Sequence, residues 1–192
     1  TVCAGQNATF TVVATGTFLT YQWQENTGSG FADISGATNP SYTKVGTTPA
    51  MNGYQYRVVL NGPCIPLTSD AVLLTVHTAP AITTQPVSTT VCAGNNASFG
   101  VAATGTALTY QWQENTGSGW NNLPGETSTS FTKVSTTPAM NGYQYRVTVA
   151  GACTPAVTST IVTLTVNSLP AISSHPNNAT LCEGSNAIFN VG

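Results

Sequence analysis

Five cysteines are the residues of this 192-residue chain whose type and spacing could do chemistry. Cys3, Cys92 and Cys182 stand in near-copies of one phrase, TVCAGQNATF, TVCAGNNASF and TLCEGSNAIF, and Cys64 and Cys153 close the phrases NGPC and AGAC. The Cys-x-x-Cys spacing of a zinc site does not occur. Cysteines at fixed repeat positions are typical of disulfides in an oxidising compartment, so we expect all five to be structural disulfide cysteines.

Histidines and carboxylates form no catalytic pattern. His77 and His175 do not recur at the matching repeat positions, and no Ser or Cys nucleophile with an orienting group accompanies either of them. Glu25 and Glu114 do recur, but no carboxylate pair has the arrangement of a glycosidase acid and base. The linkers HTAPAI and NSLPAI carry no carboxylate for Ca²⁺. We therefore expect a chain that is not an enzyme and holds no metal and no cofactor.

Two aromatic residues are the candidates for binding a ligand. Phe31 and Trp120 share one position, directly after the phrase TGSG. An exposed ring there could stack on a sugar, which makes both residues candidate glycan-stacking residues. The alternative is that each ring folds back over the edge of a sheet and seals the core, because large aromatic side chains are mostly buried.

The composition excludes some classes of partner. Only 5% of the residues are charged, the net charge is −2, and four residues carry permanent positive charge: Lys44, Arg57, Lys133 and Arg146. This leaves no basic stripe to neutralise phosphates, so we expect no nucleic-acid partner. No run of eighteen apolar residues occurs, so we expect no membrane-spanning segment. Thr, Ser, Asn and Gly solvate the surface instead of charge, which suits an extracellular location.

An internal repeat of about 89 residues organises the chain. Trp23 recurs as Trp112 at that spacing, whereas Cys92 and Cys182 are one residue further apart. The difference indicates a single insertion in the strand or linker before the third copy. We expect a segment of a longer array, with a first repeat that lacks its first strand, a complete second repeat, and the first strands of a third. The predicted bounds are 1–77, 78–167 and 168–192.

Short alternating runs split by Gly, Pro, Asn and Ser predict an all-β repeat, since no stretch holds a helical period. Pro86 is expected to interrupt the first strand and to shift the chain into a second short segment. About eight short strands with frequent turns favour a two-sheet sandwich. The expected strands of the second repeat are 81–86, 87–91, 96–104, 108–115, 120–123, 128–134, 143–149 and 158–166.

The landmarks of this repeat resemble those of an immunoglobulin-like domain. Trp112 occupies the position of the buried strand-C tryptophan, and Gly142 followed by Tyr145 resembles the tyrosine-corner motif. Val101 and Val147 stand where such domains carry an inter-sheet disulfide, so an apolar pair replaces the bond. The fold class that the resemblance implies is a tandem array of immunoglobulin-like β-sandwiches.

A narrower resemblance rests on the combined phrases VCAGxNAxF, YQWQ, MNGYQYRV and GxC. This combination resembles the tandem immunoglobulin-like repeats of large surface adhesins and gliding-associated proteins of Bacteroidetes-type bacteria, which use type IX secretion. The resemblance implies a structural and adhesive segment of a cell-surface stalk or filament. The expected partners are the neighbouring repeats, further copies in a fibre, and an adhesion target or surface glycan. The alternative is a carbohydrate-binding accessory module of a secreted polysaccharide-degrading enzyme.

The strand directions of an immunoglobulin-like sandwich predict how the cysteines pair. Cys92 lies nine residues before Val101, and Cys153 lies six residues after Val147, so the two cysteines are expected at opposite ends of the repeat. At about 3.3 Å per residue they stand several tens of ångströms apart, and a disulfide requires Cα atoms within about 7 Å. The preferred pair is therefore Cys3 with Cys153, across the joint between repeats. Cys64 and Cys92 would then await the preceding and following repeats.

Overall fold

This computed structural model describes residues 1–190. The first and second repeats both fold into short strands, as the alternating pattern predicts. The second repeat is the fuller one. Its strands are β10 (Ala81–Thr84), β11 (Thr89–Cys92), β12 (Ala97–Gly100), β13 (Ala102–Thr104), β14 (Thr109–Asn115), β15 (Trp120–Asn122), β16 (Ser130–Lys133), β17 (Gln144–Ala150), β18 (Val157–Thr158) and β19 (Val162–Asn167), with a 3₁₀ turn η2 (Pro138–Met140) before β17.

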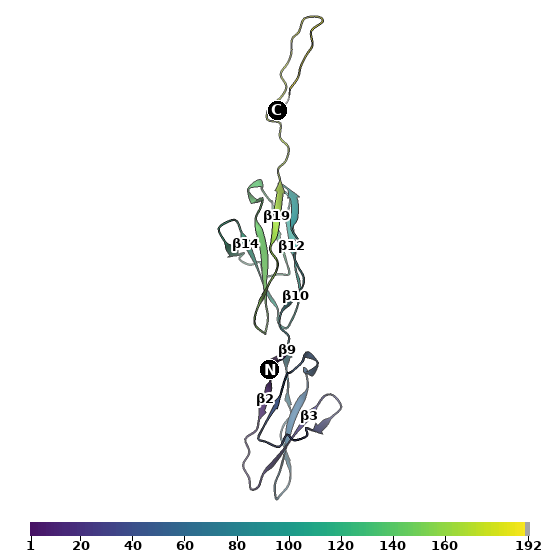
Figure 1. Ribbon diagram of the computed structural model, residues 1–192, viewed down its shortest axis with the longest axis vertical. Coiled ribbons are helices and arrows are strands. Elements are labelled where there is room, and N and C mark those ends of the chain that lie inside the picture. Colours follow the sequence, from purple (N-terminus) through teal and green to yellow (C-terminus); the bar gives the residue numbers. More distant parts are fainter. Residues whose placement is uncertain (191–192) are drawn as a thin grey trace.

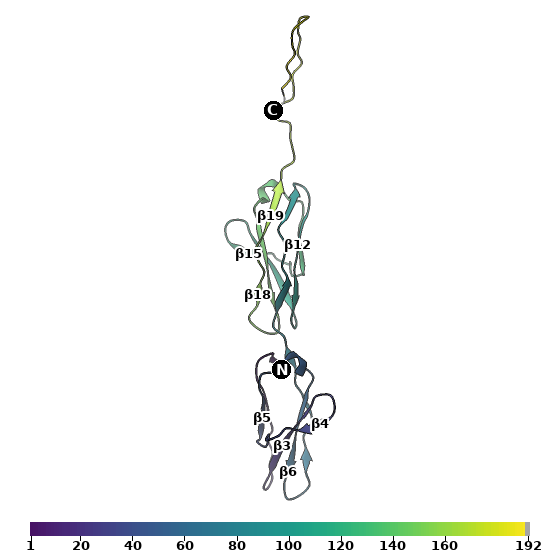
Figure 2. The same cartoon turned by 45° about the vertical axis from the view of Figure 1, so that its right-hand side comes forward.

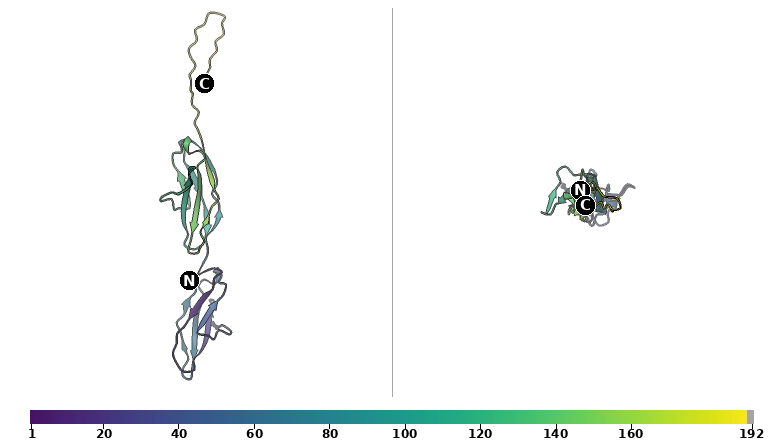
Figure 3. Two further views of the ribbon diagram at one scale, coloured as in Figure 1. Left: turned by 60° about the vertical axis from the view of Figure 1, so that its left-hand side comes forward. Right: turned by 90° about the horizontal axis from the view of Figure 1, so that it is seen from above.

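The first repeat shows the same order without counterparts of β10 and β13, and two short strands, β8 and β9, stand in the place of β19. Its elements are β1 (Val2–Cys3), β2 (Ala8–Thr11), β3 (Thr20–Asn26), β4 (Phe31–Asp33), β5 (Ser41–Lys44), η1 (Pro49–Met51), β6 (Gln55–Asn61), β7 (Leu67–Thr68), β8 (Val72–Leu73) and β9 (Val76–His77). Figure 1 shows the two sandwiches one above the other, with the N-terminus at the joint between them. Figure 2 and Figure 3 show the same end-to-end arrangement from other sides, so the molecule is a rod.

Two layers face each other in each repeat. In the second repeat one layer has the order β11-β19-β17-β14-β15, with β18 also on β17, and the other contains β12 paired with β16. The first strand is interrupted at Pro86, as predicted, and its two segments have different partners: β10 pairs antiparallel with β13, and β11 pairs parallel with β19. Pro86 is buried between the two segments. A proline cannot donate a ladder hydrogen bond, which explains why the chain changes sheets there.

The core lies between the layers and is built from the apolar residues that alternate with polar ones along each strand and face inward. Trp112, Tyr145 and Val147 are fully buried, and Val101 belongs to the same cluster. An apolar pair therefore takes the place of the inter-sheet disulfide, as the sequence predicts. The Trp112 indole N–H donates to the Ser128 carbonyl at 2.9 Å, which satisfies its one polar atom.

One sequence expectation needs correction, because the extra residue lies earlier than predicted. The Ser69 hydroxyl accepts from the Val58 N–H in the first repeat, and the Ser159 hydroxyl accepts from the Val147 N–H in the second, both at 3.0 Å. These equivalent bonds bring the two copies into register at a spacing of 90. The spacing of 90 already holds for Leu67 of β7 and Val157 of β18, so the insertion lies between Cys153 and Val157, in a loop that tolerates an added residue, and not in the last strand or the linker.

The predicted first strands of a third repeat are not formed. Residues 168–190 contain no strand, and every one of them is exposed. Strands form by pairing, and the counterparts of β13 and β19 that would pair with this segment are not among the described residues. No helix within residues 1–190 is both long and apolar enough to cross a membrane.

Candidate functional site

The joint between the two repeats is the best-defined candidate site. On the side of the first repeat, β1 runs parallel to β9, which places Val2 opposite Val76 and Cys3 opposite His77. The Ala4 N–H donates to the His77 carbonyl at 2.8 Å. Because His77 is the last residue of β9, this pairing holds Cys3 where the chain leaves the first repeat. His77 itself is half-buried and lies at the joint.

The second repeat meets the joint through its loops. The Thr78 N–H donates to the Thr106 hydroxyl at 2.9 Å, and the Thr106 N–H donates to the Thr78 carbonyl at 3.1 Å. The Ala152 N–H donates to the Thr106 carbonyl at 2.8 Å, which ties the loop after β17 to the same point. Pro80 is buried beneath these loops. The linker is thus fixed by hydrogen bonds and burial.

A disulfide between Cys3 and Cys153 closes the joint. Their Cα atoms lie 5.9 Å apart, within the range that a disulfide spans, and Cys153 is 2% exposed. This is the pairing predicted by counting residues along the strands from the core valines to each cysteine. Cys64, Cys92 and Cys182 carry free thiols and are exposed.

The candidate glycan-stacking residues, Phe31 and Trp120, lie on the outer face of a sheet. Their rings are neither fully exposed for stacking nor folded into the core. The Arg57 guanidinium carbon lies 3.9 Å from the centroid of the Phe31 ring, and the Arg146 guanidinium carbon lies 4.1 Å from that of Trp120. Both rings are half-buried, and neither is among the residues packed against a core cluster. The expectation that they seal the core is therefore wrong. A cation–π contact covers one face of each ring instead.

Hydrogen bonds hold each arginine over its ring. Arg57 Nε donates to Gln24 Oε1 at 2.7 Å, and Gln24 Nε2 donates to Asp33 Oδ1 at 2.8 Å. The second repeat repeats this chain through Arg146 and Gln113. A sugar that stacks on Phe31 or Trp120 would have to displace the arginine or use the remaining exposed part of the ring.

Sequence reasoning missed a polar tie between the two layers. In the second repeat Lys133 Nζ, from β16, donates to Glu114 Oε1 at 2.8 Å, and the Tyr145 hydroxyl donates to the same oxygen at 2.8 Å. Glu114 on β14 and Tyr145 on β17 belong to one layer, whereas Lys133 on β16 belongs to the other, so the contact joins both layers. The first repeat has the same tie in Glu25, Lys44 and Tyr56. The recurrence of glutamate and lysine in both copies was the available signal.

Burial and hydrogen bonding together set the ionisation of this tie. Desolvation, followed by the hydrogen bond to Glu114, raises the pKa of the Tyr145 hydroxyl far above its usual value of 10. In the first repeat desolvation alone would raise the pKa of Glu25, but the hydrogen bonds from Lys44 and Tyr56 outweigh it and lower that pKa. Each tyrosine therefore remains a neutral donor to a carboxylate. These groups tie strands of the two layers together. Residues 1–190 hold no cluster of three or more His, Cys, Asp or Glu side chains suited to a metal.

Two sandwiches of this topology, joined end to end, define a tandem immunoglobulin-like protein. Solved structures agree on the fold. A two-domain fragment of DIP-gamma matches 86% of this chain and 92% of its own, at 16% identity and a TM-score of 0.57. The I67–I69 fragment of titin matches 86% and 61%, at 12% identity and a TM-score of 0.61.

The chain belongs to the family described as Domain of unknown function (DUF8696), whose model matches residues 1–78 and 81–168. A curated relative is Endoglucanase C of Cellulomonas fimi, which is 38% identical over 116 residues. That match covers 59% of this chain and only 10% of the relative, so it spans about a tenth of that protein.

Proposed function

We propose that this chain is a spacer segment of an extracellular stalk or filament, in which a disulfide across each joint makes consecutive repeats act as one rod. The main support for this proposal is the Cys3–Cys153 disulfide, which joins two repeats instead of lying within one. A bond inside each domain would strengthen the domains and leave the joint free to bend. A bond across the joint adds a second covalent connection beside the linker, and this opposes bending and torsion.

The same logic extends to the free cysteines. Cys64 in the first repeat is the counterpart of Cys153, and Cys92 in the second repeat is the counterpart of Cys3. Both are exposed at the ends of their repeats. In a longer array each would bond to the adjacent repeat, so every joint would carry one disulfide. Disulfides persist in oxidising surroundings, which supports an extracellular location at a cell surface. Export by the type IX route and a role in adhesion are part of the same proposal, and rest on the sequence resemblance.

Small-angle X-ray scattering on the oxidised chain and on a Cys3→Ala/Cys153→Ala variant tests the spacer function. We expect the oxidised chain to scatter as a rigid rod and the variant to show a shorter mean end-to-end distance. Cys64→Ala is the matched control, because it removes an exposed thiol outside the joint. Identical profiles for the oxidised chain and the double variant would show that the bond does not hold the joint straight, and would remove the basis of the proposal.

A second candidate function is an accessory module of a polysaccharide-degrading enzyme. The match to part of an endoglucanase favours it, since such a segment could space or bind within a secreted enzyme. Trp120 and Phe31 would be its sugar-contacting residues. Retention of the chain on insoluble cellulose and on glycan arrays, lost in a Trp120→Ala/Phe31→Ala variant, would support binding. If the chain is retained on no polysaccharide, the result would contradict the carbohydrate-binding function and leave the spacer function.

A further inference from the structure

Two of the four lysine and arginine side chains carry a charge that no carboxylate balances. Lys44 and Lys133 each pair with a glutamate, at 2.8 Å. Arg57 and Arg146 form no ion pair within residues 1–190, although a glutamine and an aromatic ring hold each of them in place. Only 5% of the residues are charged, so a fixed cation without a counter-ion is a candidate site for an anionic group of a ligand.

In the second repeat three neighbouring side chains leave hydrogen-bond donors free. Arg146 Nε donates to Gln113 Oε1 at 2.7 Å, but neither Nη atom donates to a protein acceptor in the described part of the chain. Gln113 Nε2 donates to Asn122 Oδ1 at 2.8 Å, which fixes the Asn122 amide and leaves its Nδ2 without an acceptor there. The Trp120 indole N–H also has no acceptor among residues 1–190, unlike the indole N–H groups of the two buried tryptophans.

These donors share the outer face of one sheet. Gln113 on β14 pairs with Arg146 of β17 on one side and with Asn122 of β15 on the other. Neighbouring strands are spaced by about 4.8 Å, so the backbones of Arg146 and Asn122 are about 10 Å apart. Trp120 lies two residues before Asn122 and therefore on the same face, and its ring contacts the Arg146 guanidinium. Figure 2 shows β15 at the side of the second repeat, where the sheet face is open to a ligand.

The first repeat has the same arrangement with two differences, and each of them removes a donor. Phe31 stands in the place of Trp120 and has no N–H, and Asp33 stands in the place of Asn122. Asp33 Oδ1 accepts from Gln24 Nε2 at 2.8 Å, and its negative charge would repel an anion that approaches the arginine of that repeat. The glutamine and the arginine are common to both repeats, so the second repeat is the one whose face favours an anionic ligand.

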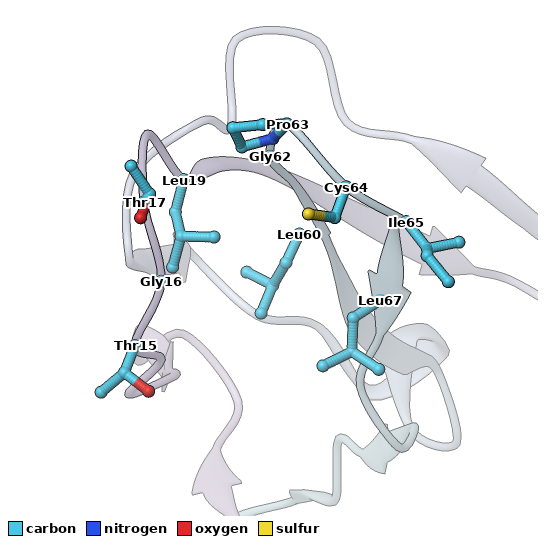
Figure 4. Close-up of a pocket in the computed structure, with 10 residues that line it drawn as sticks. All are labelled: Thr15, Gly16, Thr17, Leu19, Leu60, Gly62, Pro63, Cys64, Ile65 and Leu67. Carbon is cyan, nitrogen blue, oxygen red and sulfur yellow. The ribbon is translucent and has the colours of Figure 1, made fainter.

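Two hollows of the described chain are less suited to an anion. The hollow at the end of the first repeat away from the joint has a volume of about 520 Å³, and none of the residues that line it is charged (Figure 4). A hollow of about 540 Å³ on the second repeat is lined by hydroxyl and apolar side chains and also contains no charged residue. The candidate anion site therefore lies on the open sheet face and not in either hollow.

We propose that the outer face around Arg146 and Trp120 binds a carboxylated sugar, namely a hexuronate unit of an acidic polysaccharide. The carboxylate accepts from both Arg146 Nη atoms, in the bidentate geometry that a guanidinium favours. Sugar oxygens accept from Asn122 Nδ2 and from the Trp120 N–H. The arginine stays on the ring, and the sugar contacts the part of the ring that remains exposed.

The neutral donors favour a sugar over an acidic peptide. Asn122 and Trp120 carry no charge, so they match the hydroxyl and ether oxygens of a sugar better than they match a second carboxylate. The inference goes beyond the spacer function. It rests on the second candidate function, the accessory module, and assigns a class of ligand to it.

Titration of the 192-residue chain with trigalacturonate, followed by ¹H–¹⁵N NMR, tests the site. Of the three indole N–H signals, only that of Trp120 should shift, because the other two groups are buried and donate to backbone carbonyls. Cellotriose is the matched neutral probe, and we expect it to bind at least about 10-fold more weakly, since it lacks the carboxylate. Added NaCl should weaken the binding of trigalacturonate and leave that of cellotriose unchanged.

The difference between the two repeats supplies the variants. Asn122→Asp should weaken trigalacturonate binding by about 10-fold or more, and the repeat should still fold, because the first repeat folds with aspartate at this position. Ser130→Asp is the matched control, since it adds the same charge at an exposed position of the other layer. Phe31→Trp with Asp33→Asn should create a second binding site in the first repeat.

Several outcomes would overturn the proposal. Equal binding of cellotriose, or retention on cellulose without any binding of trigalacturonate, would contradict the carboxylated ligand and leave the accessory-module function standing. Binding of no glycan at all would contradict both of them and would not affect the scattering test of the spacer function. Equal binding of a triglutamate peptide would show that any carboxylate suffices and would contradict the assignment to a sugar. Unchanged binding by Asn122→Asp would place the ligand elsewhere.

Discussion

Removal of the joint disulfide should lower the stability of both repeats, although the bond lies inside neither of them. The perturbation is Cys3→Ala with Cys153→Ala, which leaves no buried hydroxyl at position 153. Cys3 belongs to the first repeat through its pairing with His77, and Cys153 belongs to the second, where the N–H of the neighbouring Ala152 donates to the Thr106 carbonyl. Unfolding of either repeat therefore occurs with one end of the bond still anchored.

The magnitude follows from the loop that the bond closes. The two cysteines are 150 residues apart in sequence. Because His77 holds Cys3 at the start of the linker, unfolding of the second repeat alone frees a loop of only about 75 residues, for which the chain-entropy estimate is about 4.5 kcal/mol. Unfolding of the first repeat alone frees a loop of similar length. When both repeats unfold the loop doubles, which adds about 0.6 kcal/mol. Disulfides commonly stabilise by about 2–4 kcal/mol, so we expect a loss in that range for each repeat.

Native-state hydrogen exchange reads the two repeats separately, since β6 and β17 report on the first and second repeat. We expect the free energy of opening to fall by about 2–4 kcal/mol in both strands of the double variant relative to the oxidised chain. Cys64→Ala should change neither strand. A loss below about 1 kcal/mol in both strands, or a loss confined to one repeat, would refute the loop argument.

Other predictions concern the second repeat. Because the pKa of Tyr145 is raised, the folded state keeps a proton that the unfolded state loses above pH 10. The free energy of unfolding should therefore fall by about 1.4 kcal/mol per pH unit beyond that value. Tyr145→Phe should remove this slope in urea titrations between pH 9 and pH 11. Glu114→Gln should cost about 1.5–3 kcal/mol in urea unfolding at pH 7, because it weakens two hydrogen bonds to a charged acceptor, whereas Glu183→Gln in the exposed C-terminal segment should cost nothing measurable. Arg146→Ala should cost only about 0.5–1 kcal/mol but should expose the Trp120 ring, which would appear as increased quenching of its fluorescence by acrylamide; unchanged quenching would show that the guanidinium does not cover the ring.

The sequence by itself determined the all-β class, the repeat and the pairing across the joint. Residues Tyr110, Trp112 and Val147 alternate with polar neighbours, and this period-2 pattern is a local property that needs no knowledge of distant contacts. Once the strand directions are assigned, counting from Val101 to Cys92 and from Val147 to Cys153 places the cysteines at opposite ends. Distance along a strand is proportional to residue number, so the sequence alone could predict which pair is too far apart to bond.

Only the tertiary structure decided which side chains meet across strands that are distant in sequence. Glu114, Lys133 and Tyr145 come from three strands, and their convergence depends on how the two layers pack and on register. The contact between Arg146 and Trp120 likewise depends on rotamers and on the order of strands in the sheet. Such features are set by non-local packing, which a pattern of residue types along the chain does not encode.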